Sequence, residues 1–267
     1  MLSSFLFIIS GQAYGWETKT NSNGDTLHWT TNEVHYALNA EGSHGLSNSD
    51  VETAIQNAAA AWSFGNLSFV FDGDTKKNSA DYSDNVFSVY FSDNWTEDPE
   101  VMAITYTWST SEGEIVHFDM EINSEHHDWS IDGSADKHDL QNAITHEFGH
   151  ALGLDHSAQE QATMAPTALP GEISKRDLEQ DDIDGYQNLY KDLQGTTQNN
   201  TTTNDQANNS GGGFTEEAAS GSNKNQKLQN GTYSVPLQTT GCSSSNASVG
   251  WFGLLFGVLL SWRRRSL

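Results

Sequence analysis

The sequence predicts an α+β fold, and three observations support that prediction. Strand-like segments rich in β-branched and aromatic residues recur through the first half of the chain. One amphipathic helical segment lies among them, and a second helical pattern begins near Asp139. The predicted strands lie at residues 28–38, 67–71, 86–91, 101–108 and 114–122.

The first predicted helix runs from about residue 51 to residue 63. Ser49 and Asp50 precede it, and both are residue types that cap helix amino termini. Its apolar residues recur at the spacing that buries one helix face. They are Val51, Ala54, Ile55, Ala58, Ala61 and Trp62.

The second helical pattern carries His146 and His150, which are four residues apart. On a helix such residues lie about 40° apart around the axis, so both imidazoles reach one ion on the same face. Gly153 can adopt the left-handed conformation, end the helix and return the chain, so that His156 approaches from another direction. Three imidazoles with a fourth position open to water are typical of a catalytic zinc site. The alternatives are a chance histidine pair and a structural metal site.

Glu147 lies next to the first of these histidines. A carboxylate there can take a proton from a zinc-bound water, whose pKa is lowered to about 7, and pass it to a leaving amine. The pattern therefore predicts a hydrolase in which Glu147 is the catalytic residue.

The spacing His-Glu-x-x-His-x-x-Gly-x-x-His, followed by a methionine turn, is the metzincin protease signature. Ser157 follows the third histidine and Met164 lies in Ala162–Pro166, so the chain resembles the matrixin branch of that group. The resemblance covers residues 16–191 and is to the bacterial type. It implies a zincin-like domain with a twisted mixed sheet and about three helices. It also implies that Met164 forms an apolar base under the imidazoles without binding the metal.

Three further segments take roles from the resemblance. Residues 177–190 resemble the last matrixin helix, where Asp181 and Asp182 would support the methionine turn and the mature amino terminus; a solvated acidic helix start is the alternative. Residues 101–108 would be the edge strand to which an extended substrate adds by main-chain hydrogen bonds. Residues 166–174 would wall the pocket for the residue after the scissile bond.

A calcium ion is also expected, since hard carboxylate oxygens suit it. The candidate ligands are Asp72, Asp74, Asp119 and Glu121. The segment His117-Phe118-Asp119 partly matches the matrixin ligands of a second zinc, but we favour His117 as an ordinary strand residue with a satisfied ring.

The two ends of the chain differ from its middle. Residues 1–15 contain the apolar run Phe5–Ile9 and predict a signal peptide, so export to the medium or the cell surface is expected. Residues 192–241 are rich in Asn, Thr, Ser and Gly and predict a disordered linker. Residues 242–267 combine Cys242, a short apolar run and three arginines. They resemble a myxobacterial-type carboxy-terminal sorting signal, in which Cys242 would be lipidated; a plain short membrane anchor is the alternative.

Composition narrows the range of partners. The formal net charge is −24, and nearly all of it lies within residues 16–191. Such a surface repels nucleic acid and anionic membranes, so membrane contact is expected only through the tail. The single cysteine allows no intrachain disulfide and offers no latency cysteine ahead of the catalytic segment.

Together these patterns predict a monomeric, secreted or surface-tethered zinc metalloendopeptidase that hydrolyses proteins or peptides. Its narrower form is a specific processing or toxin protease. The alternative from another class is a noncatalytic zinc-binding surface or adhesion protein.

Overall fold

A computed structural model describes residues 14–193, 238–240 and 243–244. The predicted signal peptide up to residue 13, most of the predicted linker, Cys242 and the apolar run lie outside the described residues. Within the described residues, no helix combines the length and apolar character that crossing a membrane requires.

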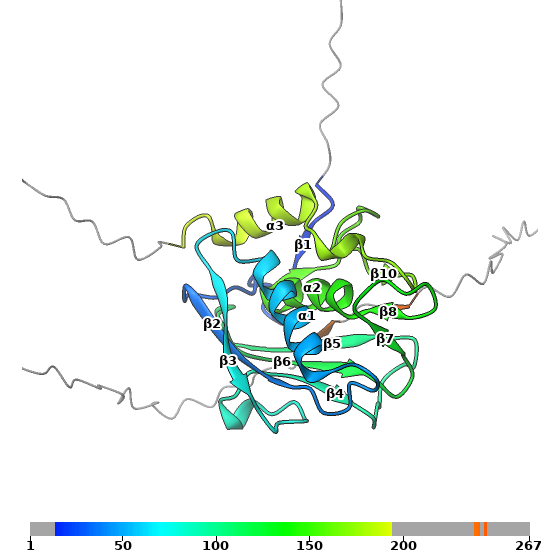
Figure 1. The fold of residues 1–267 in the computed structure, drawn as a ribbon. Coiled ribbons are helices and arrows are strands. Elements are labelled where there is room, and N and C mark those ends of the chain that lie inside the picture. Colours follow the sequence, from blue (N-terminus) through cyan, green and yellow to red (C-terminus); the bar gives the residue numbers. More distant parts are fainter. Residues whose placement is uncertain (1–13, 194–237, 241–242, 245–267) are drawn as a thin grey trace, which may run out of the picture.

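A six-stranded mixed sheet forms the centre of the fold (Figure 1). Its strand order is β11-β5-β6-β4-β2-β3. The bounds are β2 Glu33–Asn39, β3 Ser68–Asp74, β4 Ser88–Ser92, β5 Ala103–Ser109, β6 Ile115–Asn123 and β11 Gln238–Thr240. Strands β2, β3, β4 and β6 run parallel to one another, whereas β5 is antiparallel to β6 and β11 is antiparallel to β5. The predicted α+β class with a mixed sheet is confirmed.

Three α-helices accompany the sheet: α1 Asn48–Ala61, α2 Leu140–Ala151 and α3 Gln180–Tyr190. Helix α1 begins earlier than predicted, because Ser47 caps it by accepting a hydrogen bond from the Asp50 amide. Helices α1 and α2 lie side by side on the same face of the sheet (Figure 1). The indole of Trp62, just after α1, donates a 2.8 Å hydrogen bond to the Thr145 carbonyl of α2.

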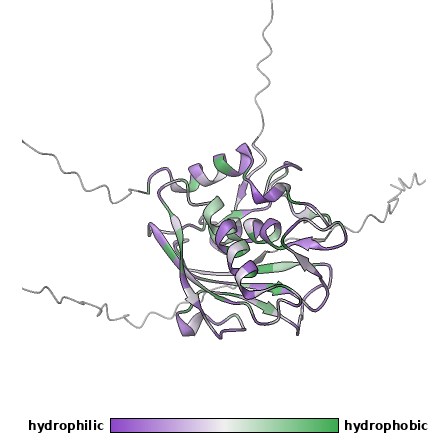
Figure 2. Cartoon of the chain, viewed as in Figure 1, coloured by the Kyte–Doolittle hydropathy of each residue, from purple (hydrophilic) through white to green (hydrophobic). Residues whose placement is uncertain are grey.

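The space between this helix pair and the sheet is the main core. Aromatic rings fill it, with Phe148 of α2 lying 5.2 Å from Tyr36 of β2 and 4.6 Å from Phe69 of β3, centroid to centroid. In Figure 2 the apolar colouring is concentrated on strands and helices, while the loops around them are hydrophilic. Helix α2 is thus buried along nearly its whole length, which holds its histidines rigidly.

Short two-stranded pairings and 3-10 turns complete the fold. Strand β1 Glu17–Thr18 pairs with β9 Leu154–Asp155, β7 Trp129–Ser130 with β8 His138–Asp139, and β10 Thr167–Ala168 with β12 Ser243–Ser244. The 3-10 turns are Tyr82–Asp84 and Ser174–Arg176. The pairing of β11 with β5 and of β12 with β10 was not predicted from the polar composition of the tail.

Candidate metal centre

Two residues, Asp139 and Gly153, set the beginning and the end of helix α2. The Asp139 carboxylate caps its amino terminus, accepting from the Asn142 amide at 2.9 Å. Gly153 follows the helix with φ +99°, as predicted. A β-carbon at Gly153 would lie 2.3 Å from the Leu27 carbonyl oxygen, so only glycine fits this return of the chain. The chain then enters β9, which places His156 beside the helix.

The three predicted histidines come together. His146, His150 and His156 each offer one ring nitrogen, and these three nitrogens lie within 4.8 Å of one another. Among the described residues, no other group of three or more His, Cys, Asp or Glu ligand atoms is gathered this closely. The first two rings are fully buried and the third is partly exposed.

Backbone carbonyls fix the orientation of two of these rings. His146 Nδ1 lies 2.7 Å from the Thr163 carbonyl oxygen, and His150 Nδ1 lies 2.9 Å from that of Leu154. Because a carbonyl oxygen only accepts, Nδ1 carries the hydrogen in both rings and Nε2 keeps its lone pair. Both Nε2 atoms are buried and make no hydrogen bond within the protein. A buried lone pair of this kind is suited to a metal ion, so the residues present fit zinc.

Burial also keeps these rings neutral, as metal binding requires. Desolvation is the largest influence and lowers the pKa of His146 and of His150 well below 6.5. The positive charge of the buried Lys175 lowers that of His146 further. The hydrogen bonds to Thr163 and Leu154 act in the opposite direction but do not reverse the shift.

The turn after His156 forms the base of the site. Met164 is buried there, and a β-carbon built at Gly149 would lie only 2.2 Å from its sulfur. Helix α2 therefore packs closely on Met164 at Gly149, and the role of Met164 as an apolar base under the imidazoles stays a prediction. Asp182 of α3 holds the turn by accepting from the amides of Thr163 and Met164 at 2.8 and 3.0 Å.

Asp181 supports the neighbouring segments. It accepts a 2.7 Å hydrogen bond from the Gly15 amide and one of 2.6 Å from the Ser157 hydroxyl. The two aspartates of α3 thus serve the methionine turn and the amino-terminal segment, as the resemblance implied.

Glu147 is fully buried and faces β5. Its Oε2 accepts a 2.7 Å hydrogen bond from the Thr105 hydroxyl, which lies 3.1 Å from the Glu147 carbonyl oxygen as well. The buried Lys19 donates to the Thr107 hydroxyl on the same strand at 3.1 Å. Burial lowers the pKa of the Lys19 ammonium to about 8, while the carboxylates of Glu147 and Asp155 oppose that shift. Sequence reasoning missed Thr105 and Lys19, because only the fold brings them to α2.

The proposed calcium ligands are not gathered into one group in the described part of the chain. Asp119 is buried and already accepts from the Asp81 amide, from the Ser88 amide and hydroxyl, and from the His117 ring. His117 is a buried β6 residue whose Nε2 lies 3.1 Å from Asp119, as expected for a satisfied strand histidine. Glu121 accepts from the Tyr106 hydroxyl at 2.8 Å. The carboxylates of Asp119 and Glu121 therefore accept hydrogen bonds from other groups of the protein.

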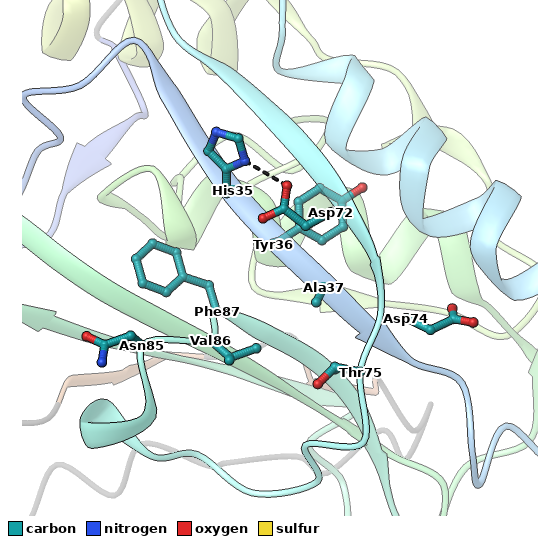
Figure 3. Close-up of a pocket in the computed structure, with 9 residues that line it drawn as sticks. All are labelled: His35, Tyr36, Ala37, Asp72, Asp74, Thr75, Asn85, Val86 and Phe87. Atoms are coloured by element: carbon teal, nitrogen blue, oxygen red, sulfur yellow. Dashed lines mark hydrogen bonds and ion pairs between the residues drawn. The ribbon is translucent and has the colours of Figure 1, made fainter. Parts of the chain in front are cut away.

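Figure 3 shows a separate pocket of about 330 Å³ that none of the three clustered histidines lines. The Asp72 carboxylate turns to His35 there, at 2.8 Å from its Nδ1, and Asp74 lies apart from both. The potential ligand atoms of His35, Asp72 and Asp74 in this pocket are not gathered into one group, unlike those of the three clustered histidines.

Comparisons with known proteins agree with this geometry. The sequence matches the family described as Matrixin (Peptidase_M10) over residues 28–191. It is 29% identical to Metalloendoproteinase 1-MMP of Arabidopsis thaliana over 177 residues, which are 64% of this chain and 45% of that protein. It is 30% identical to human Matrix metalloproteinase-26 over 55% of this chain and 54% of that protein. Human Neutrophil collagenase is 32% identical over 54% of this chain and 30% of that protein. The matched region thus spans about half of these relatives or less.

Proposed function

Because the chain belongs to the matrixin family, we propose that it is a secreted or surface-tethered zinc endopeptidase that cleaves extended segments of proteins or peptides. His146, His150 and His156 would hold the zinc ion through Nε2. The observation that carries the proposal is the pair of buried Nε2 lone pairs beside a buried carboxylate.

The zinc ion, when bound, supplies a Lewis acid that polarises the peptide carbonyl and lowers the pKa of water. Glu147 takes the proton as the water oxygen bonds to the carbonyl carbon, and returns it to the amine nitrogen as the C–N bond breaks. Thr105 keeps the Glu147 carboxylate on the strand side of helix α2. The Nδ1 hydrogen bonds keep the two helical imidazoles from rotating.

The substrate would lie as an extended strand between β5 and the wall formed by residues 166–174. Strand β5 is bordered by β6 on one side and, among the described residues, only by the three-residue strand β11 on the other, so this second side would accept a peptide strand when β11 is not paired with it. The wall at residues 166–174 includes β10 and borders a hollow of about 490 Å³ lined in part by Pro166, Leu169 and Glu172. We propose that this wall sets the preference for the residue after the scissile bond.

The test compares three forms of the full chain on casein and on a mixed peptide library read by mass spectrometry. The parent is expected to cleave, and a chelator to stop it. Glu147→Gln should keep its zinc and lose peptide cleavage by at least a hundredfold, since general base catalysis contributes about 10²- to 10⁴-fold. Glu41→Gln, which changes an exposed loop glutamate, is the matched control and should cleave like the parent. Full turnover by Glu147→Gln would refute the assigned role, and inactivity of the zinc-loaded parent would favour a noncatalytic zinc protein.

A further inference from the structure

The side of β5 that faces away from β6 pairs with a distant part of the same chain. Strand β11 pairs with it in antiparallel register, Gln238 opposite Thr107, Thr239 opposite Tyr106 and Thr240 opposite Thr105. The pairing ends at Thr105, the residue whose hydroxyl binds Glu147. The carboxy-terminal end of β11 is thus next to the strand position that holds the catalytic carboxylate.

A second anchor follows after two residues. Strand β12 pairs in parallel with β10, Ser243 opposite Thr167 and Ser244 opposite Ala168. Strand β10 begins three residues after Met164, beyond the turn whose Thr163 carbonyl binds His146. From Thr240 to Ser243 there are three peptide steps of about 3.8 Å each, so the two anchors lie at most about 11 Å apart. One short segment therefore reaches both edges that flank the metal centre.

Building on the proposed function, we propose that β11 and β12 together are an intramolecular competitor for the peptide-binding cleft. An extended peptide held by main-chain hydrogen bonds along β5 needs the amide and carbonyl groups that β11 uses. The two cannot bind at once. Because the competitor is part of the same chain, it has a high effective concentration, and a dilute substrate must displace it.

The residue types agree with this assignment. Thr239 and Thr240 are β-branched and favour strands, and pairing along a sheet edge depends on the backbone and not on a particular side-chain sequence. A segment that binds through its backbone imitates the part of a substrate that all peptides share. The tail would therefore restrain cleavage of many substrates equally.

Amide hydrogen exchange of the full chain tests the docking without requiring activity. The background is Glu147→Gln, which prevents self-cleavage. The Asn123 amide bonds to the Met102 carbonyl, so by alternation along β5 the Tyr106 amide points to β6 and the amides of Thr105 and Thr107 point to β11. The amides of Thr105 and Thr107 should lose protection when β11 is prevented from pairing. Thr240→Pro removes the amide that faces Thr105 and distorts the strand, and should speed exchange at Thr105 and Thr107 at least tenfold. Thr203→Pro, the same change elsewhere in the tail, is the matched control and should leave that exchange unchanged.

Exchange within β6 reports whether the domain remains folded in all three proteins, and it should not change. Equal protection of the Thr105 and Thr107 amides in Thr240→Pro and its parent would overturn the docking. Protection that rises with protein concentration would overturn the intramolecular assignment, because it would indicate pairing between chains.

The activity arm uses the same proline substitutions with Glu147 intact. On a short fluorogenic peptide, Thr240→Pro should raise kcat/KM at least threefold over both the parent and Thr203→Pro. Equal kcat/KM in three active proteins would overturn the competition. Absence of cleavage in all three, with the exchange difference present, would count against the peptidase and support the docking.

Discussion

The Thr105 hydroxyl of β5 donates a 2.7 Å hydrogen bond to Oε2 of Glu147, and both side chains are fully buried. This contact joins β5 to the helix that carries His146 and His150. It places the carboxylate and the strand in one fixed arrangement.

Thr105→Val keeps the shape of the side chain and removes the hydroxyl. We expect kcat/KM for peptide cleavage to fall about ten- to a hundredfold, since a hydrogen bond to a charged group contributes about 1.5–3 kcal/mol. Thr105→Ser restores the hydroxyl and should recover most of the rate. Equal rates for all three proteins would show that Glu147 is positioned without this contact.

Gly149→Ala should disturb the base of the site. The added carbon would lie 2.2 Å from the Met164 sulfur and 2.8 Å from Cζ2 of Trp62. Overpacking of this kind costs about 1–3 kcal/mol, which urea unfolding would measure. In a Met164→Ala background the same change should cost less, because one of the two neighbours is gone. Identical costs in both backgrounds would contradict direct packing between Gly149 and Met164.

Asp182→Asn should destabilise the methionine turn. The carboxylate accepts from the amides of Thr163, Met164 and Glu179, and one amide oxygen cannot replace both carboxylate oxygens. We expect the free energy of unfolding to fall by about 2–4 kcal/mol. The control Asp184→Asn, which changes an acidic residue two positions on, should shift it by less than about 0.5 kcal/mol. A cost no larger than that of the control would remove Asp182 from the support of the turn.

His138 should make the fold sensitive to acid. It is buried in β8, where desolvation and the nearby His127 lower its pKa from 6.5 to about 4. The unfolded chain therefore binds this proton first, so stability is full above about pH 6.5 and falls as the pH drops toward 4. His138→Gln should reduce the loss of unfolding free energy between pH 7 and pH 4.5, whereas His126→Gln, at an exposed position, should not. Parallel pH curves for both variants and the parent would contradict this account.

The proximity of the three imidazoles could be predicted from the sequence because it depends on local geometry. The offset between His146 and His150 and the turn at Gly153 depend on one helix and one glycine, and the structure gathers all three rings. Residues 101–108 were predicted as the edge strand, whereas β5 is second in the sheet because β11 pairs outside it. The predicted cap at Ser49 and Asp50 was wrong, since Ser47 caps α1, and the helix begins at Asn48 instead of about residue 51.

Contacts between distant segments could not be predicted in this way. Thr105 meets Glu147 across 42 residues, and their proximity depends on how β5 packs against α2. Asp119 has a residue type that suits calcium, but its oxygens accept from the Asp81 amide and from the amide and hydroxyl of Ser88 at the start of β4. Strand β11 lies in a segment of low hydrophobicity, and a strand added at an existing edge requires no core of its own.

Zinc content per chain is the most direct test of the account. Elemental analysis of the folded full chain should find one zinc ion per molecule in the parent and in His126→Ala. Single His146→Ala, His150→Ala and His156→Ala variants should each lose most of it. Less than about a tenth of an equivalent in the well-folded parent, or undiminished zinc in all three ligand variants, would contradict the assigned metal centre.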